Sequence, residues 1–196
     1  MSGVIIKKYD TLPISEREIM RYAGAGAPTE EVVSLMREAL CESGDVFSYS
    51  VCYCESELSV TETICDFGFF KAESKSLSKN LSGCGRAIIF AATVGIGLDR
   101  LLARYSRTSP SRALMLQAIG AERIEALCDR FSSDMEASLG KKLRPRFSAG
   151  YGDLSIEVQR DIFRVLDASK NIGVSLNRSM LMSPTKSVTA FIGIEE

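Results

Sequence analysis

Residues 86–93 are Arg86-Ala87-Ile88-Ile89-Phe90-Ala91-Ala92-Thr93, and the run from Ala87 to Ala92 is entirely apolar. Such a run is typical of a β-strand that is buried on both faces, because a strand with one face in water alternates apolar and polar side chains. Gly95 and Gly97 follow the run and predict the end of the strand. We therefore expect this strand to be covered on both of its sides.

Further strands and helices are predicted around this run. Residues 46–54 and 58–67 mix β-branched, aromatic and small polar residues in rough alternation, which suggests a pair of antiparallel strands, and residues 186–194 predict a closing strand. The longest helical pattern covers residues 109–139, where apolar residues recur at three- and four-residue spacing. Because strands and helices are interspersed without regular alternation, the sequence favours an α+β fold with a mostly antiparallel sheet.

The first 45 residues are predicted to be helical. Ser15 and Glu18 have the spacing of a capping box, which opens a short helix, and a second helix follows between Thr29 and about Cys41. No internal repeat or change of composition marks a linker. We therefore expect one domain of 196 residues, in which an N-terminal helical part, 1–45, precedes a sheet-plus-helix core, 46–196.

Charge and hydropathy bear on the partners and on the location of the protein. The formal net charge is -1, from 24 basic and 25 acidic side chains, so no long-range field attracts nucleic acid or an anionic membrane. The sequence shows no apolar run of membrane-spanning length and no signal-peptide pattern at its N-terminus. We expect a cytoplasmic protein that binds neither nucleic acid nor a membrane.

The chain contains no histidine. This excludes the Ser-His-Asp and Cys-His schemes of nucleophilic catalysis and every zinc site that needs imidazole. It also removes the usual general base near neutral pH, so the side-chain inventory is poor for a hydrolase.

Six cysteines are present, and the closest pair is Cys52 and Cys54. One intervening residue is not the usual spacing of a zinc knuckle, whereas free cysteines in a cytosolic protein are commonly buried and reduced. Buried structural thiols are therefore favoured over metal or redox chemistry, and no metal site is predicted.

Two other patterns have plain structural explanations. Gly95-Ile96-Gly97 follows a buried strand as a dinucleotide-binding loop does, but Arg100 occupies the third glycine position, so a tight strand-to-helix turn is favoured over a nicotinamide site. Glu122, Glu125 and Asp129 share a helix with Arg130. A solvated helix face with local ion pairs is favoured there, and carboxylates facing a cationic ligand are the alternative.

The segment Arg146-Phe147-Ser148-Ala149-Gly150-Tyr151-Gly152 has the residues of a ligand-binding loop. Gly150 and Gly152 let the backbone take positive φ and approach a bound molecule, and Arg146 supplies a guanidinium that can grip a carboxylate. Ser148 adds a hydrogen-bonding group, and Tyr151 offers a flat apolar face with a polar tip. These residues also occur in ordinary turns, so the chemistry alone leaves a ligand site and a plain turn about equally open.

The stretch from Arg146 to Leu154 resembles the signature loop of the C-terminal reactivation domain of cobalamin-dependent methionine synthase, in which Arg is followed after three residues by Gly-Tyr. Further segments resemble that family in the same order along the chain. They are Ala91-Ala92-Thr93-Val94-Gly95, Ala126-Leu127-Cys128-Asp129-Arg130, Asn171-Ile172-Gly173-Val174-Ser175-Leu176 and Met182-Ser183-Pro184-Thr185-Lys186-Ser187-Val188.

This resemblance implies a C-shaped α+β domain whose twisted, mostly antiparallel sheet is flanked by helices. It implies that the chain binds S-adenosylmethionine and docks on the cobalamin domain of a methionine synthase, or of a related corrinoid methyltransferase, for the reductive methylation of cob(II)alamin. Flavodoxin or a similar carrier would donate the electron. The chain would be a stand-alone accessory component without turnover of its own and without a catalytic side chain.

The resemblance also assigns roles within the loop. Arg146 would bind the carboxylate of S-adenosylmethionine, and Ser148, Ala149 and Gly150 would complete that site. Tyr151 and Gly152 would face the cobalamin.

Two other functions remain open. The first is a docking or chaperone protein for a corrinoid protein that no longer binds S-adenosylmethionine. The second is a thiol-based metal or redox protein that uses Cys52, Cys54 and Cys65.

Overall fold

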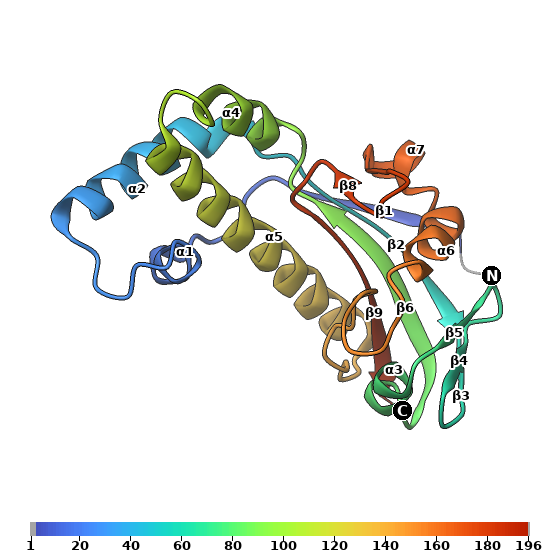
Figure 1. Ribbon diagram of the computed structural model, residues 1–196. Helices are drawn as coiled ribbons and strands as arrows, with labels where there is room; N and C mark the ends of the chain where they lie inside the picture. Colours follow the sequence, from blue (N-terminus) through green and yellow to red (C-terminus); the bar gives the residue numbers. More distant parts are fainter. Residues whose placement is uncertain (1–2, 196) are drawn as a thin grey trace.

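The computed structural model describes residues 3–195, and an antiparallel four-stranded sheet lies at its centre (Figure 1). The strand order is β1-β2-β6-β9. The strands are β1 (Ile5–Tyr9), β2 (Tyr49–Glu57), β6 (Cys84–Thr93) and β9 (Ser187–Glu195). Strand β6 contains the apolar run and is paired along its length, with β2 on one side and β9 on the other.

Helices cover both faces of this sheet. Helix α5 (Pro110–Leu139) packs its Leu127 and Phe131 against Ile88 and Phe90 of β6. The opposite face, with Ile89 of β6, is covered by three helices and the loop that follows α5. These helices are α3 (Lys75–Asn80), α6 (Val158–Leu166) and α7 (Ala168–Ile172). Because successive side chains of a strand point to opposite faces, this double cover accounts for a run without polar residues. The predicted α+β fold with an antiparallel sheet is confirmed.

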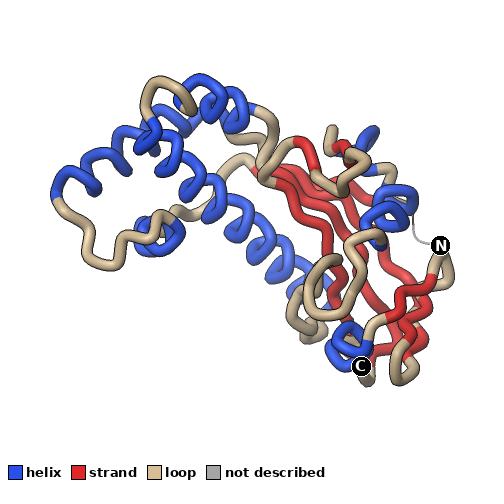
Figure 2. The backbone as a smooth tube through the Cα atoms, viewed as in Figure 1, coloured by secondary structure: helices blue, strands red, loops and turns tan. Residues whose placement is uncertain are grey.

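The N-terminal half of α5 extends beyond the sheet and carries three further helices, which together form the helical arm (Figure 2). They are α1 (Glu16–Tyr22), α2 (Glu30–Ser43), which a short 3-10 helix (Gly44–Val46) follows, and α4 (Gly97–Tyr105). Ser15 caps α1 by accepting a hydrogen bond from the backbone N–H of Glu18, as the capping box predicts. A Cβ at Gly120 of α5 would lie 2.2 Å from Leu98 Cδ2, so any other residue there would force the Leu98 side chain of α4 to move.

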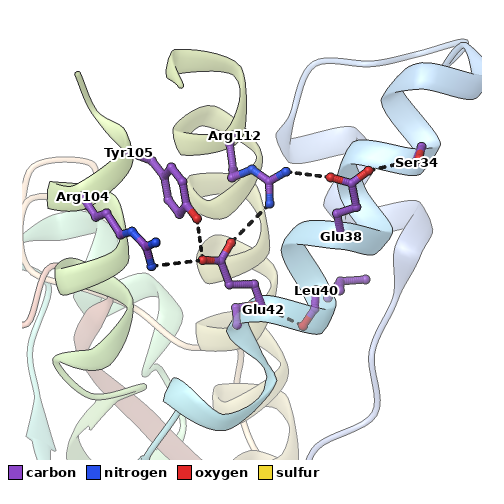
Figure 3. Close-up of polar contacts among 8 residues, drawn as sticks. Ser34, Glu38, Leu40, Glu42, Arg104, Tyr105 and Arg112 are labelled. Carbon is purple, nitrogen blue, oxygen red and sulfur yellow. Dashed lines mark hydrogen bonds and ion pairs between the residues drawn. The ribbon is translucent and has the colours of Figure 1, made fainter. Parts of the chain in front are cut away.

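A polar cluster holds α2 against α4 and α5 in this arm (Figure 3). The carboxylate of Glu42 accepts a hydrogen bond of 2.6 Å from Tyr105 Oη and one of 3.2 Å from Arg112 Nη1. Arg112 also donates to Glu38 at 2.6 Å, and Arg104 lies 3.7 Å from Glu42. The arm therefore has an apolar interior, and hydrogen bonds and ion pairs connect its helices along one side.

The predicted strand over residues 58–67 is wrong, because a turn divides it. The structure has two short strands there, and Thr61 Oγ1 accepts a hydrogen bond of 3.0 Å from the backbone N–H of Ile64 inside the turn between them. Strand β2 pairs with β1 and β6 rather than with this region. The short strands are β3 (Ser59–Val60), β4 (Ile64–Asp66) and β5 (Lys71–Glu73) in one sheet, and β7 (Ser175–Leu176) and β8 (Met182–Ser183) in another.

The sequence predicts that the N-terminal part, 1–45, is helical, and this prediction is wrong for residues 5–9, which form strand β1. Residues 5–9 pair with β2 in antiparallel register, from Ile5 opposite Tyr53 to Tyr9 opposite Tyr49. All five residues are exposed or half-buried, so β1 lacks the alternation of a strand with one buried face. Within residues 3–195, no helix has both the length and the apolar character to cross a membrane.

Candidate functional site

The loop that contains Arg146 begins as a partial strand along the outer edge of β9. Arg144 donates its backbone N–H to Gly193 O at 2.8 Å, and Phe147 and Phe191 exchange two backbone hydrogen bonds of 2.9 Å. This pairing covers the edge of β9 and fixes where the loop starts. Arg146 and Phe147 are consecutive residues in this extended segment, so their side chains point to opposite faces of the sheet.

Arg146 lies on the α5 side and is held by two carboxylates of that helix. Its Nη1 is 2.6 Å from Asp129 Oδ1, and its Nη2 is 2.9 Å from Glu125 Oε2. Burial by itself would lower the pKa of Arg146, but the hydrogen bond with Asp129 and the nearby carboxylates raise it overall, so the guanidinium stays charged. The side chains of Glu125 and Asp129 are 46% and 70% exposed, whereas that of Arg146 is 24% exposed, so the two acids are more accessible to solvent than the arginine.

The second half of the loop lies on the opposite side of the sheet edge. Phe147 and Ala149 are buried in the apolar cluster beneath α6, and the exposed ring of Tyr151 meets Phe147 edge-on at 5.5 Å between centroids. Arg146 and Tyr151, which are close in sequence, are therefore separated by the edge of the sheet. Ser148 is half-buried, and its carbonyl accepts a hydrogen bond from the backbone N–H of Tyr151.

The two glycines adopt the conformations that the sequence predicts. Gly150 has φ +84° and Gly152 has φ +58°, both in the left-handed region that disfavours other residues. A Cβ on Gly150 would lie 2.8 Å from Ile156 Cδ1, so the turn is also closely packed. The backbone N–H of Gly150 donates to Leu154 O at 2.9 Å. The segment is a compact turn rather than an open loop.

Asp153 anchors this turn, and the sequence did not single it out. Its carboxylate accepts hydrogen bonds from the hydroxyl of Ser74, from the backbone N–H of Lys75 at 2.8 Å and from that of Ser76 at 3.1 Å. These donors hold the pKa of Asp153 far below its usual range, with the Ser74 hydroxyl as the largest cause. Ser74 is also the N-cap of α3, so the turn is tied to the first turn of that helix.

A cavity of about 590 Å³ lies on the α5 side, between α5 and the N-terminal segment that includes α1. The N-terminal wall consists of Pro13, Ile14, Ser15, Glu18, Arg21 and Tyr22, and the α5 wall of Glu122, Glu125, Ala126, Asp129, Arg130 and Ser133. The cavity is thus adjacent to Arg146 through its two carboxylate partners. Arg146 itself does not line the cavity, and neither do residues 147–152.

The N-terminal wall is fixed to α5 by a buried ion pair. Arg123 donates to the carboxylate of Glu122 and to the backbone carbonyls of Leu12 and Pro13. Glu122 in turn accepts a hydrogen bond of 3.0 Å from the backbone N–H of Ser15. The expectation of a solvated helix face is therefore wrong for Glu122, which is 4% exposed because the N-terminal segment covers it.

Most of the cysteines lie in the protein interior, and Gly95-Ile96-Gly97 forms a tight turn. Five cysteines are buried and Cys41 is exposed, and burial raises the pKa of Cys54 to about 11 and that of Cys52 to about 12. Among residues 3–195, no three acidic or cysteine side chains are grouped so that they could hold a metal ion. A Cβ at Gly97 would lie 2.2 Å from Val46 O, so this glycine permits the tight strand-to-helix turn that the sequence predicts.

Comparison with known proteins identifies the fold. No family model matches the chain, and no curated protein matches it. Among solved structures it is similar to the MetH reactivation domain bound to AdoHcy (S-adenosylhomocysteine), with a TM-score of 0.70. The match covers 97% of this chain and 78% of that chain, at 13% sequence identity. The resemblance in the loop therefore extends to the whole architecture, and this chain has the fold of the MetH reactivation domain.

Proposed function

We propose that this chain is a stand-alone reactivation subunit for a cobalamin-dependent methionine synthase or a related corrinoid methyltransferase. In this role it binds S-adenosylmethionine and docks on the cobalamin domain of its partner, with flavodoxin or a similar carrier as electron donor. The observation that carries the proposal is the fold, which is shared over 97% of the chain with a reactivation domain bound to AdoHcy.

The cavity beside Arg146 fits S-adenosylmethionine in size and charge. Its volume of about 590 Å³ lies within the range of small-molecule sites, and it has charged groups of both signs. S-adenosylmethionine carries a sulfonium and an ammonium, which Glu125 and Asp129 attract, and a carboxylate, which a guanidinium binds. Tyr22 on the opposite wall offers a ring for the adenine, and Arg21 already stacks on it at 4.3 Å.

Arg146 is the residue to which we assign the ligand carboxylate. Its guanidinium is charged and fixed, and the carboxylate of Asp129 is 70% exposed, so the ligand can replace Asp129 at a modest cost in solvation. Ser148, Ala149 and Gly150 turn away around the sheet edge. We therefore propose that these three residues position Arg146. Their backbone would contact only the part of the ligand that reaches the edge of the sheet.

The cobalamin would be held by the partner and would supply the cobalt that accepts the methyl group. The role of this chain would be to orient S-adenosylmethionine toward the cobalt, because no side chain has to act as nucleophile or base. Tyr151, which is 70% exposed, and the adjoining Gly152 would form the surface toward the cobalamin. The hydrogen bonds of Asp153 connect that surface to the N-terminus of α3.

One observation favours a second function. Both terminal nitrogens of Arg146 already have carboxylate partners within this chain. A protein that docks on a corrinoid protein without binding S-adenosylmethionine would keep such an arrangement permanently. The exposed ring of Tyr151 would then remain as part of the docking surface.

Calorimetry with S-adenosylmethionine separates the two functions. We expect binding in the micromolar range, and Arg146→Ala should weaken it roughly 10- to 150-fold, which corresponds to the loss of about 1.5–3 kcal/mol of charged hydrogen bonds. Arg160→Ala is the matched control, because Arg160 is an exposed arginine on α6 whose one ion pair within residues 3–195 is with Glu157. If the protein with its natural sequence does not bind S-adenosylmethionine, the reactivation function is contradicted and the docking function is favoured.

A reactivation assay tests the complete proposal. A corrinoid methyltransferase without its own reactivation domain is combined with a reductant and with S-adenosylmethionine that carries a labelled methyl group. We expect label on the partner's cobalamin when this chain is present and none when it is omitted. Labelling that is independent of the chain contradicts the reactivation role, whatever the calorimetry shows.

A further inference from the structure

The two carboxylates that pair with Arg146 lie between its guanidinium and the cavity on the α5 side. Glu125 and Asp129 both line the cavity, whereas Arg146 does not. They hold different terminal nitrogens, with Asp129 Oδ1 2.6 Å from Nη1 and Glu125 Oε2 2.9 Å from Nη2. Before the guanidinium can bind an anion in the cavity, one of these two partners has to move away.

Asp129 is the partner that can leave at the lower cost. Its hydrogen bond with Arg146 is exposed to solvent, whereas that of Glu125 is partly buried. The Asp129 side chain is also 70% exposed, and within residues 3–195 its carboxylate has no other hydrogen bond or ion pair. Solvent weakens such an exposed pair, and an exposed side chain changes rotamer rapidly. Glu125 is less exposed, so it is the partner that keeps the guanidinium in place.

We propose that Asp129 is an internal competitor for the ligand, because its carboxylate occupies Arg146 until a carboxylate that enters the cavity takes its place. The identity of that ligand rests on the proposed function, whereas the competition for Arg146 is a property of this chain. No covalent bond is formed or broken, since one ion pair is exchanged for another. The displaced carboxylate of Asp129 stays beside the cavity, where it can meet a positive group of the ligand.

Competition has a different sign from simple attraction. If Asp129 only attracts the positive groups of the ligand, its removal weakens the binding of every ligand that carries them. If Asp129 competes for Arg146, its removal also strengthens the contribution of the ligand carboxylate to binding. S-adenosylmethionine and its decarboxylated form both carry a sulfonium and an ammonium, and they differ in the carboxylate alone. Comparison of these two ligands therefore separates competition from attraction.

Calorimetry with the two ligands is the first test. The ratio of the Kd of decarboxylated S-adenosylmethionine to the Kd of S-adenosylmethionine should rise about two- to fivefold in Asp129→Asn, which is the range expected for an exposed ion pair. Glu125→Gln is the matched control one turn away on α5, and it should not raise the ratio. In an Arg146→Ala parent, Asp129→Asn should leave the ratio unchanged. A ratio that is unchanged or lower in Asp129→Asn alone, or that rises equally in Glu125→Gln, overturns the proposal.

Nuclear magnetic resonance of arginine side chains tests the same contact without S-adenosylmethionine. Acetate, a plain carboxylate, is titrated while the Nε–H resonance of Arg146 is followed, with sodium chloride at equal ionic strength as the control for screening. Half-saturation should need about two- to fivefold less acetate in Asp129→Asn than in the natural sequence. Equal half-saturation, or a resonance that acetate moves in neither protein, overturns the proposal. If acetate behaves as expected but S-adenosylmethionine does not bind, the competition stands and the proposed function is contradicted.

Discussion

At the scale of single residues, Glu122 and Arg123 form the most deeply buried ion pair of the described residues, with side chains 5% and 2% exposed. Burial of two charges is costly, and it is tolerated here because backbone groups of Leu12, Pro13 and Ser15 complete their hydrogen bonds. The pair therefore fixes the N-terminal wall of the cavity to α5.

Arg123→Met should destabilise the protein by about 3–5 kcal/mol, because it leaves the carboxylate of Glu122 buried without its cationic partner. Urea unfolding followed by circular dichroism measures this change in the free energy of unfolding. Arg130→Met is the matched control on the same helix, since Arg130 is 54% exposed and its pair with Asp134 should contribute less than about 1 kcal/mol. Similar losses for the two variants would contradict the role given to the buried pair.

At the scale of elements, Asp153 joins the turn after Gly152 to the N-terminus of α3. The carboxylate faces the backbone N–H groups of Lys75 and Ser76, which have no partner within the helix. A negative charge at this end of a helix is favourable because of the helix dipole. The turn and α3 should therefore open together.

The contribution of Asp153 to stability should depend on pH with a definite sign. Because hydrogen bonds lower the pKa of its folded form below the ordinary value of 3.8, the contribution is fully present above that value and is lost as the pH falls below it. The difference in melting temperature between the natural protein and Asp153→Asn should be constant above about pH 5 and shrink below about pH 4. A difference that stays constant down to about pH 2 would contradict this anchoring role.

At the scale of the whole molecule, the helical arm and the sheet share α5 (Figure 1). The C-terminal half of α5 packs on the sheet, and the N-terminal half packs against α1, α2 and α4. The arm is thus a separate apolar cluster, closed along one side by the contacts of Glu42 with Tyr105 and Arg112 (Figure 3).

Loss of Glu42 should loosen the arm without affecting the sheet. Glu42→Ala removes the hydrogen bonds from Tyr105 and Arg112, which for a partly exposed group we expect to contribute about 1 kcal/mol, or roughly a fivefold change in the opening equilibrium. Hydrogen exchange should become faster in α2 and α4 and stay unchanged in β6. Glu38→Ala is the control, because Glu38 is 56% exposed and should have a smaller effect. Equal acceleration in β6 would show that arm and sheet open as one unit.

The sequence by itself determined the features that depend on neighbours along the chain. Ile88, Ile89 and Phe90 predicted a strand covered on both faces, Ser15 with Glu18 predicted the start of α1, and Gly150 with Gly152 predicted a turn with positive φ. Each of these is set by local backbone conformation or by periodicity, which a single stretch of residues contains.

The tertiary structure alone decided what depends on distant partners. Strand β1 forms because β2 offers it an edge, since its own residues lack alternation. Glu122 is buried because the segment at Ser15 folds across it, and Arg146 is paired because α5 brings Glu125 and Asp129 to it. A charged side chain has the same residue type whether it faces water, a ligand or a partner carboxylate, so packing decides which of these it meets.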